Sequence, residues 1–175
     1  QLSNYQEIYQ ALFNLEATPA ESTAYRFAKM DKERYPNIQT ANHNNIPYYT
    51  NSSHLDVKYT SDLFEALDIQ DPLQTEYTSG TVFHAFLGER VNDYRSAMKL
   101  VQTIATNYKL PYFTLSPTYS ICKHHGYLKG ELIKCPTCHE ETEIYSRITG
   151  YYRPLKNWND GKQAEFNNRN LYNLK

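Results

Sequence analysis

The strongest constraint on the fold is the placement of the cysteines. The chain has three, and all of them lie between residues 122 and 138. Together with one histidine they follow the spacing C-x2-H-x9-C-x2-C, which offers Cys122, His125, Cys135 and Cys138 as ligands. A structural zinc ion takes four nitrogen or sulfur ligands in a tetrahedron, and two such knuckles across a short hairpin supply them. Free thiols or a disulfide are the alternatives, but a disulfide leaves one cysteine over and gives the histidine no role. The spacing therefore predicts a structural zinc ribbon with no open coordination position.

Two neighbouring histidines are alternative fourth ligands. His124 adjoins His125, and His139 follows Cys138 directly. His125 is preferred because it holds the second ligand position of a C-x-x-[CH] knuckle, and the glycine after it permits a positive φ. The other histidines are scattered along the sequence and are interpreted as polar or packing residues: His43, His54 and His84.

Length, charge and hydropathy limit the functional classes. The chain has 175 residues, which suits one domain, or one domain with a small module. Its net charge of −1 argues against a nucleic-acid-binding surface driven by bulk charge. No apolar run approaches the length of a membrane span, and the first residues lack the basic start and apolar core of a signal peptide. We therefore expect neither a nucleic-acid nor a membrane partner.

Helix-start signals and apolar periodicity predict several helices. Thr18 as N-cap, Pro19 at the first helical position and Glu21 in a capping box predict a helix that runs to about Arg34. Asp62 is expected to open a shorter one. The remaining helical segments are residues 4–15, a short stretch around Phe166, and residues 90–108, whose amphipathic pattern places Tyr94, Met98, Val101 and Ala105 on one face.

Extended segments account for much of the rest. Residues 81–87 read as a buried strand, residues 111–121 as extended chain, and residues 36–56 mostly as loop. Strand character returns at residues 142–152, and Gly150 lies inside this segment. Glycine weakens a strand and usually marks a bulge, a bend or a close approach of the backbone. Its presence so soon after the cysteine segment needs an explanation.

The glycine and the cysteine segment belong to one pattern. The cysteine-pair ribbon is followed by the segment RITGY (147–151) and then by the polar segment NDGKQAE (159–165). This order resembles the C-terminal end of anaerobic (class III) ribonucleoside-triphosphate reductases. The segments ATPAE (17–21) and YYTNSSHLDV (48–57) are similar to family segments in the same order. The resemblance thus extends over nearly the whole chain.

The resemblance implies both a fold and a chemistry. The fold class would be α/β, with the C-terminal part of a glycyl-radical-enzyme α/β barrel and a small zinc-ribbon module. Gly150 would carry a stable backbone radical, installed by an activase that uses S-adenosylmethionine and an iron–sulfur cluster. Donation from the amide nitrogen and withdrawal by the carbonyl stabilise a Cα radical, which flattens best without a side chain. The radical would then generate a thiyl on a cysteine, which starts the reduction of ribonucleoside triphosphates to deoxyribonucleoside triphosphates.

The sequence also departs from the family pattern. The ribbon ligands of the family are commonly four cysteines, and here His125 stands in the second position. Many members have a cysteine just before the radical glycine, where this chain has Thr149. All three cysteines here are assigned to the ribbon, so the thiyl cysteine must lie outside this chain. We therefore expect a C-terminal fragment of a longer enzyme, inactive in turnover by itself.

Glu21 has two interpretations. It can belong to the capping box, or, as the resemblance implies, it can be an active-site carboxylate that acts as general acid or base while the 2′-hydroxyl leaves. Asn51, Ser52 and Ser53 would line the same site, or they form a simple turn. Trp158 is interpreted as a packing residue.

The combined expectation has three parts along the chain. Residues 1–120 would belong to the catalytic barrel, 121–141 to the zinc ribbon, and 142–175 to the radical loop and tail. The implied partners are the activase and, through the parent chain, ribonucleoside triphosphate substrates, nucleotide effectors and a second copy in a homodimer. The implied location is cytoplasmic. A different glycyl radical enzyme and a non-catalytic zinc-ribbon adaptor, in which Gly150 is only a bulge, are the competing hypotheses.

Overall fold

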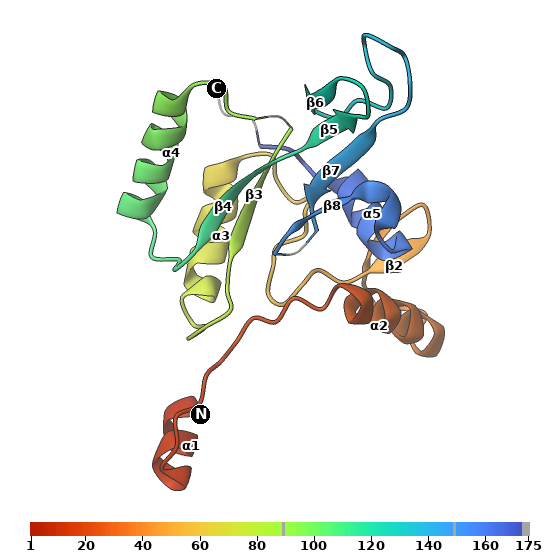
Figure 1. Cartoon of the computed structure of the whole chain (residues 1–175). Helices are drawn as coiled ribbons and strands as arrows, with labels where there is room; N and C mark the ends of the chain where they lie inside the picture. The colour runs from red at the N-terminus through yellow and green to blue at the C-terminus, as the bar shows by residue number, and fades with distance from the viewer. Residues whose placement is uncertain (89, 149, 173–175) are drawn as a thin grey trace.

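The computed structural model describes residues 1–88, 90–148 and 150–172 (Figure 1). Helices and strands are mixed along the chain. The helices are α1 (Leu2–Tyr9), α2 (Glu21–Arg34), α3 (Leu63–Gln74), α4 (Tyr94–Asn107), a 3-10 turn (Leu155–Asn157) and α5 (Asp160–Asn168). The strands are β1 (Ala41–His43), β2 (Ile46–Tyr48), β3 (Phe83–Leu87), β4 (Phe113–Pro117), β5 (Tyr119–Cys122), β6 (Gly126–Lys129), β7 (Glu143–Arg147) and β8 (Tyr152–Pro154).

Two sheets organise the centre of the molecule. Strands β3 and β4 pair in parallel, with Phe83 opposite Phe113. Strands β5 to β8 form an antiparallel sheet in the order β6-β5-β7-β8. Only one residue separates β4 from β5, so the chain passes directly from the parallel pair into the second sheet. This sheet crosses the expected boundaries at residues 120 and 141, and the three-part division of the chain stays a prediction.

The main apolar core lies between α3, α4 and the parallel pair. Its buried members include Leu67, Ala85 and Ile104. Asp62 caps α3 through its side chain, which accepts hydrogen bonds from the backbone N–H groups of Phe64 and Glu65, as the sequence predicted. A parallel pair with helices against it is consistent with an α/β architecture, and closure into a barrel stays a prediction.

A second packed region joins distant parts of the chain around α5. The helix packs against α2 and against the β1–β2 hairpin. A Cβ added at Gly161 of α5 would lie 2.5 Å from the ring of Tyr25 in α2, so glycine permits this close approach. Trp158 is buried and meets Phe166 edge to face, which confirms that it is a packing residue.

Several local predictions were wrong. Helix α2 begins at Glu21 with Ala20 as N-cap and no side-chain cap, so Thr18 does not form the predicted capping box. Residues 36–56 contain the β1–β2 hairpin, whose turn residues Asn44 and Asn45 both have positive φ. Asparagine tolerates a positive φ better than most residues do, and this allows the tight turn.

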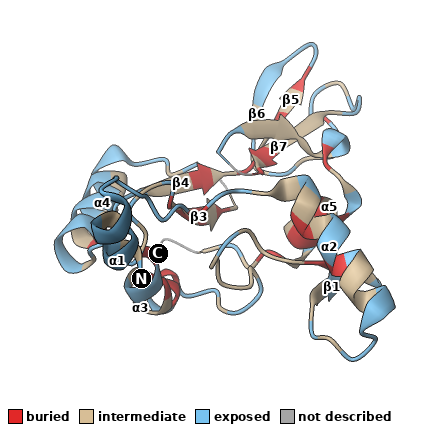
Figure 2. Cartoon of the chain, turned by 90° about the horizontal axis from the view of Figure 1, so that it is seen from below, coloured by how far each residue is buried: buried red, intermediate tan, exposed pale blue. Residues whose placement is uncertain are grey.

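The two amphipathic segments are largely exposed. Helix α1 ends at Tyr9, well before the predicted residue 15, and contains no buried residue. On α4 the predicted apolar face is open to solvent, with Tyr94 71% and Met98 60% exposed, whereas Ile104 and Leu100 pack into the core. Figure 2 shows both helices mostly in the colour of exposed residues. Within the described residues, no helix is long and apolar enough to cross a membrane.

Candidate radical-glycine loop and metal centre

The predicted metal ligands come together at one end of the four-stranded sheet. The Sγ atoms of Cys122, Cys135 and Cys138 and a ring nitrogen of His125 all lie within 4.8 Å of one another. The Cys122 Sγ is 3.6 Å from that of Cys138 and 3.7 Å from His125 Nδ1. Zinc bonded to sulfur at about 2.3 Å and to nitrogen at about 2.0 Å gives tetrahedral edges of about 3.5 to 3.8 Å. The four residues therefore have the spacing that a tetrahedral metal ion requires.

Local backbone groups favour the thiolate forms of Cys122 and Cys135, whereas at Cys138 a backbone hydrogen bond that lowers the pKa is outweighed by burial and by the two neighbouring cysteines, which raise it. The pKa of the Cys135 thiol is lowered to about 6, and the main cause is a hydrogen bond from the backbone N–H of Cys138. The backbone N–H of His124, at 3.4 Å from the Cys122 Sγ, is the main cause of the lowered pKa of Cys122. Gly126 follows the first knuckle with φ of +69°, as the sequence led us to expect.

The alternative histidine ligands lie outside this cluster. The His124 ring is 3.2 Å from Glu140 on the exposed surface. His139 has a φ of +60° and its backbone N–H donates to the Cys135 carbonyl. His125 is thus the histidine whose ring reaches the cysteines.

Gly150 occupies the connection between β7 and β8. It is exposed, and the predicted single strand over 142–152 is two strands with this turn between them. Its φ lies outside the left-handed region, and an added Cβ would meet no atom of the described residues within 4 Å, its two chain neighbours left aside. Neither backbone conformation nor crowding demands glycine here. Thr149, the residue before it, lies outside the described residues.

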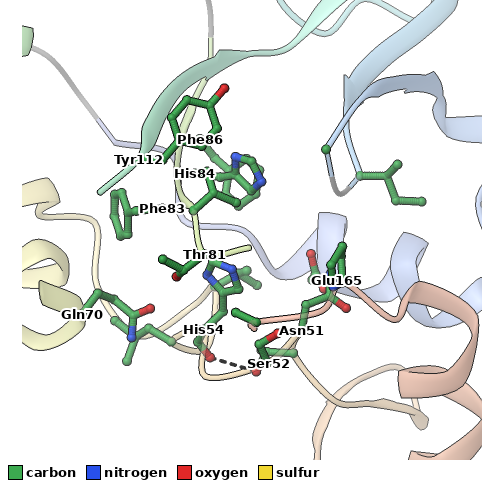
Figure 3. Close-up of a pocket in the computed structure, with 18 of the residues that line it drawn as sticks. Asn51, Ser52, His54, Gln70, Thr81, Phe83, His84, Phe86, Tyr112 and Glu165 are labelled. Carbon is green, nitrogen blue, oxygen red and sulfur yellow. Dashed lines mark hydrogen bonds between the residues drawn. The ribbon is translucent and has the colours of Figure 1, made fainter. Parts of the chain in front are cut away.

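A cavity of about 470 Å³ opens beside Gly150 (Figure 3). Its wall combines residues from the segment after β2, from β3, from α5 and from the glycine turn; they include Asn51, His54, His84, Glu165 and Gly150. This volume lies in the range of small-ligand pockets. Two of the wall residues, Asn51 and Thr81, carry buried side-chain oxygens with no hydrogen-bond partner among the described residues. A polar ligand or water would satisfy them.

Two histidines that the sequence had not linked face this cavity together. The rings of His54 and His84 stack with centroids 6.2 Å apart. Burial lowers the pKa of His54, and burial, reinforced by His54 and Arg147, lowers the pKa of His84 to about 3. Both rings are therefore neutral near pH 7. Their interpretation as polar or packing residues agrees with this burial, but their pairing across the fold is invisible in the sequence.

A buried ionic group supports the cavity from α5. Glu165 accepts hydrogen bonds from Lys162 at 2.5 Å and from Arg169 at 3.0 Å, and all three side chains are nearly inaccessible. Burial raises the pKa of Glu165, but the two cations outweigh it and the net pKa is lowered. Glu165 is therefore a charged wall residue whose oxygens are already occupied.

The fold places some of the remaining predicted site residues in the cavity wall and others outside it. Asn51 and Ser52 line the cavity, in a turn where Ser52 has φ of +50° and its hydroxyl donates to the Thr18 carbonyl. Ser53 is not part of the lining, although its backbone carbonyl accepts from Gln70. Glu21 does not line the cavity either, and its carboxylate lies 3.6 Å from Arg153. Its role as an active-site carboxylate stays a prediction.

Comparisons with known proteins agree with the sequence pattern. A family model described as anaerobic ribonucleoside-triphosphate reductase matches residues 1–172. The curated enzyme of that description from Haemophilus influenzae is 27% identical over 170 residues, which cover 90% of this chain and 23% of that protein. The one from Enterobacteria phage T4 is 31% identical over 83 residues, which cover 47% of this chain and 13% of that protein. The chain thus spans less than a quarter of the length of these relatives.

Solved structures show the same fold. A structure titled as an anaerobic ribonucleotide reductase superposes with a TM-score of 0.74 at 21% identity, covering 98% of this chain and 27% of that one. The enzyme from Thermotoga maritima, solved in complex with dATP and CTP, gives a TM-score of 0.68 at 20% identity, covering 93% of this chain and 25% of that one. From the match of the family model over residues 1–172, we conclude that the chain belongs to the anaerobic ribonucleoside-triphosphate reductase family.

Proposed function

We propose that this chain is the C-terminal, glycyl radical region of an oxygen-sensitive enzyme that reduces ribonucleoside triphosphates to deoxyribonucleoside triphosphates. One observation supports it above the others. Gly150 of the RITGY segment lines a mainly apolar cavity with a few polar groups, in a chain that matches the reductase family along nearly its whole length. A glycine that neither conformation nor crowding requires is more easily understood from the chemistry of its Cα–H bond than as a structural bulge.

The division of labour follows from the residues present. Gly150 stores the radical, and a radical S-adenosylmethionine activase installs it. The three cysteines of the chain all belong to the metal cluster. The thiol that removes a hydrogen from the substrate therefore belongs to another part of the parent enzyme, and this chain alone does not turn over. The dATP and CTP in the Thermotoga maritima complex support nucleoside triphosphates as substrate and effector ligands of the parent, which we expect to be a homodimer.

We also propose that the cysteine and histidine cluster holds a structural Zn²⁺ ion. The donor set of three thiolates and one imidazole suits zinc, and four protein ligands leave no position for substrate. When bound, the ion ties the β5–β6 hairpin to the segment that leads into β7 and the glycine turn. Its task would be to hold that turn in place.

Electron paramagnetic resonance tests the radical. The enzyme that carries this segment is treated anaerobically with its activase, and Gly150→Ala serves as the control. A doublet signal that is absent in the variant supports the proposal. If the doublet fails to form with an activase shown to be competent on a known partner, the chain is a zinc-ribbon module on an α/β scaffold.

A further inference from the structure

A continuous series of hydrogen bonds connects the cavity wall to the backbone of Gly150. The His84 Nδ1 lies 2.8 Å from the Thr114 hydroxyl, and this hydroxyl lies 2.8 Å from that of Ser116. The Nε–H of Arg147 donates to the Ser116 Oγ at 3.0 Å. The Nη1–H of the same guanidinium donates to the Gly150 carbonyl at 2.8 Å. We refer to His84, Thr114, Ser116 and Arg147 as the relay.

The elements that carry the relay hold it in place. Thr114 is the register partner of His84 across the β3–β4 pair, so the first link crosses two paired strands. Ser116 is 1% exposed and lies two residues further along β4. The guanidinium of Arg147 lies 4.8 Å from the ring centre of Tyr152, which restricts it from one side. Because the four side chains of the relay make short contacts with defined partners, they form a fixed hydrogen-bond network.

The guanidinium gives the relay a direction. Arginine is only a donor, so the Ser116 oxygen accepts from it. The Ser116 hydroxyl, which also lies beside the Tyr152 hydroxyl, can then donate to Thr114, and the Thr114 hydroxyl can donate to His84 Nδ1. An imidazole that accepts at Nδ1 carries its proton at Nε2 when it is neutral. Among the described residues, no hydrogen bond reaches His84 Nε2.

We propose that the relay fixes His84 as an Nε2–H donor for an oxygen of the nucleotide bound in the cavity and couples that contact to the Gly150 carbonyl. This inference rests on the proposed function, and it adds a ligand-contacting residue and three positioning residues to it. His84 at one end of the relay and Gly150, whose carbonyl is contacted by Arg147 at the other end, line the same cavity. A ligand that accepts from Nε2–H polarises the bonds from Arg147 through Ser116 and Thr114 to His84 toward itself. The Arg147 guanidinium donates in the opposite direction to the Gly150 carbonyl, and the strength of this contact changes with the polarisation of the other. The Arg147 contact at the far end acts on the carbonyl whose electron withdrawal stabilises a glycyl radical.

The tautomer of His84 gives a test that does not depend on the radical. Nitrogen NMR of the chain labelled at its histidines, with His84→Gln to assign the signal, should show a neutral His84 protonated at Nε2. Thr114→Val keeps the shape of the side chain and removes the hydroxyl, so the signal should shift toward a mixture of tautomers. Thr103→Val on α4 is the matched control, because the Thr103 hydroxyl only bonds the Lys99 carbonyl. An Nδ1-protonated ring in the unmodified chain, or no change in Thr114→Val, overturns the proposal.

The coupling is tested in the activated parent enzyme. CTP added to the wild type should change the hyperfine pattern or decay rate of the glycyl radical signal. In Ser116→Ala and Thr114→Val the doublet should still form, but the effect of CTP should be lost, while Thr103→Val responds as the wild type does. His84→Gln should bind CTP about fivefold to tenfold more weakly, the loss expected for one hydrogen bond. A wild-type doublet with an unchanged CTP response in all relay variants refutes the coupling, whereas absence of the wild-type doublet refutes the proposed function instead.

Discussion

Gly150 has an unhindered Cα at the edge of the cavity. The turn that carries it is held by the Arg147 contact to its carbonyl and by a backbone hydrogen bond from Ile148 to the Tyr151 carbonyl. Because no side chain or backbone atom in the described part of the chain, apart from the two chain neighbours, lies within 4 Å of a Cβ at this position, we expect the fold to tolerate other residues there. The requirement for glycine is thus separable from the requirement for stability.

This separation predicts the behaviour of Gly150→Ala. The free energy of unfolding should change by less than about 1 kcal/mol, since the backbone conformation suits alanine and the site is open. Gly161→Ala is the matched control: its Cβ would lie 2.5 Å from Tyr25, and overpacking of this kind costs about 1–3 kcal/mol. Chemical denaturation of both variants gives the comparison. Loss of folding in Gly150→Ala would return the glycine to a structural role.

The buried Glu165 illustrates the opposite case, a residue that the fold cannot lose. Removing its charge leaves Lys162 and Arg169 buried without compensation. Glu165→Gln should therefore destabilise the chain by about 3–5 kcal/mol. Glu143→Gln breaks the exposed pair with Lys156, which solvent screens, and should cost much less. Equal denaturation midpoints for the two variants would contradict this prediction.

The same carboxylate predicts a dependence on pH. Its folded pKa is lowered, so its contribution to stability is fully present above the ordinary carboxyl pKa of about 4.3. That contribution is lost as the pH falls through the lowered folded value. The difference in unfolding free energy between wild type and Glu165→Gln should therefore shrink from about pH 6 to about pH 3. Denaturation series at the two pH values measure it, and a constant difference would place the stabilisation elsewhere.

At the scale of elements, we expect a metal ion in the cysteine and histidine cluster to order the β5–β6 hairpin. Cys135→Ser should release the metal and loosen residues 120–150, because metal binding and local folding are coupled. His124→Gln should retain it, since the His124 ring contacts Glu140 and lies outside the cluster. Metal content by mass spectrometry, together with hydrogen exchange, distinguishes the variants. Stoichiometric zinc in Cys135→Ser would exclude a structural site with these ligands.

Local chemistry in the sequence predicted some elements well. Asp62 as a helix cap, the end of α2 at Arg34 and the convergence of the cysteines with His125 all depend on residues close in sequence. The Asn44-Asn45 turn carried a readable signal, because asparagine tolerates positive φ, yet the loop interpretation passed over it.

Other features depend on contacts that no local pattern encodes. The His54–His84 stack and the relay both join segments that meet only in the folded chain. The Thr18 capping box failed for a similar reason: the Thr18 carbonyl is bound by Ser52, and the chain enters α2 two residues later than the motif suggests. Tertiary contacts outweighed a local preference in each of these cases.

For the whole molecule, the exposed apolar residues of α4 and the small share of its relatives that the chain spans lead to one expectation. The apolar residues of α4 face solvent here, while the chain spans 23% of the Haemophilus influenzae relative. We expect the parent enzyme to cover this face. Met98→Lys should then leave the stability of this chain unchanged and reduce its self-association, but destabilise the full enzyme.

Analytical ultracentrifugation and thermal unfolding of both forms measure these effects. Gln102→Lys on the same helix adds the same charge at an exposed polar position and should be neutral in both. If Met98→Lys leaves the full enzyme as stable as the wild type, the α4 face is also exposed there.

The parallel pair of β3 and β4 has a consequence for handling this chain. Within the described residues, neither strand has another strand paired along its outer side, although parallel strands are normally found deep inside wider sheets. The Tyr172 N–H donates to the Phe86 carbonyl on the outer side of β3, but backbone groups without a strand partner are templates onto which a foreign strand can be added. A short extended peptide should bind there by lengthening the ladder. Without such a peptide, concentrated preparations should grow cross-β fibrils that thioflavin fluorescence detects.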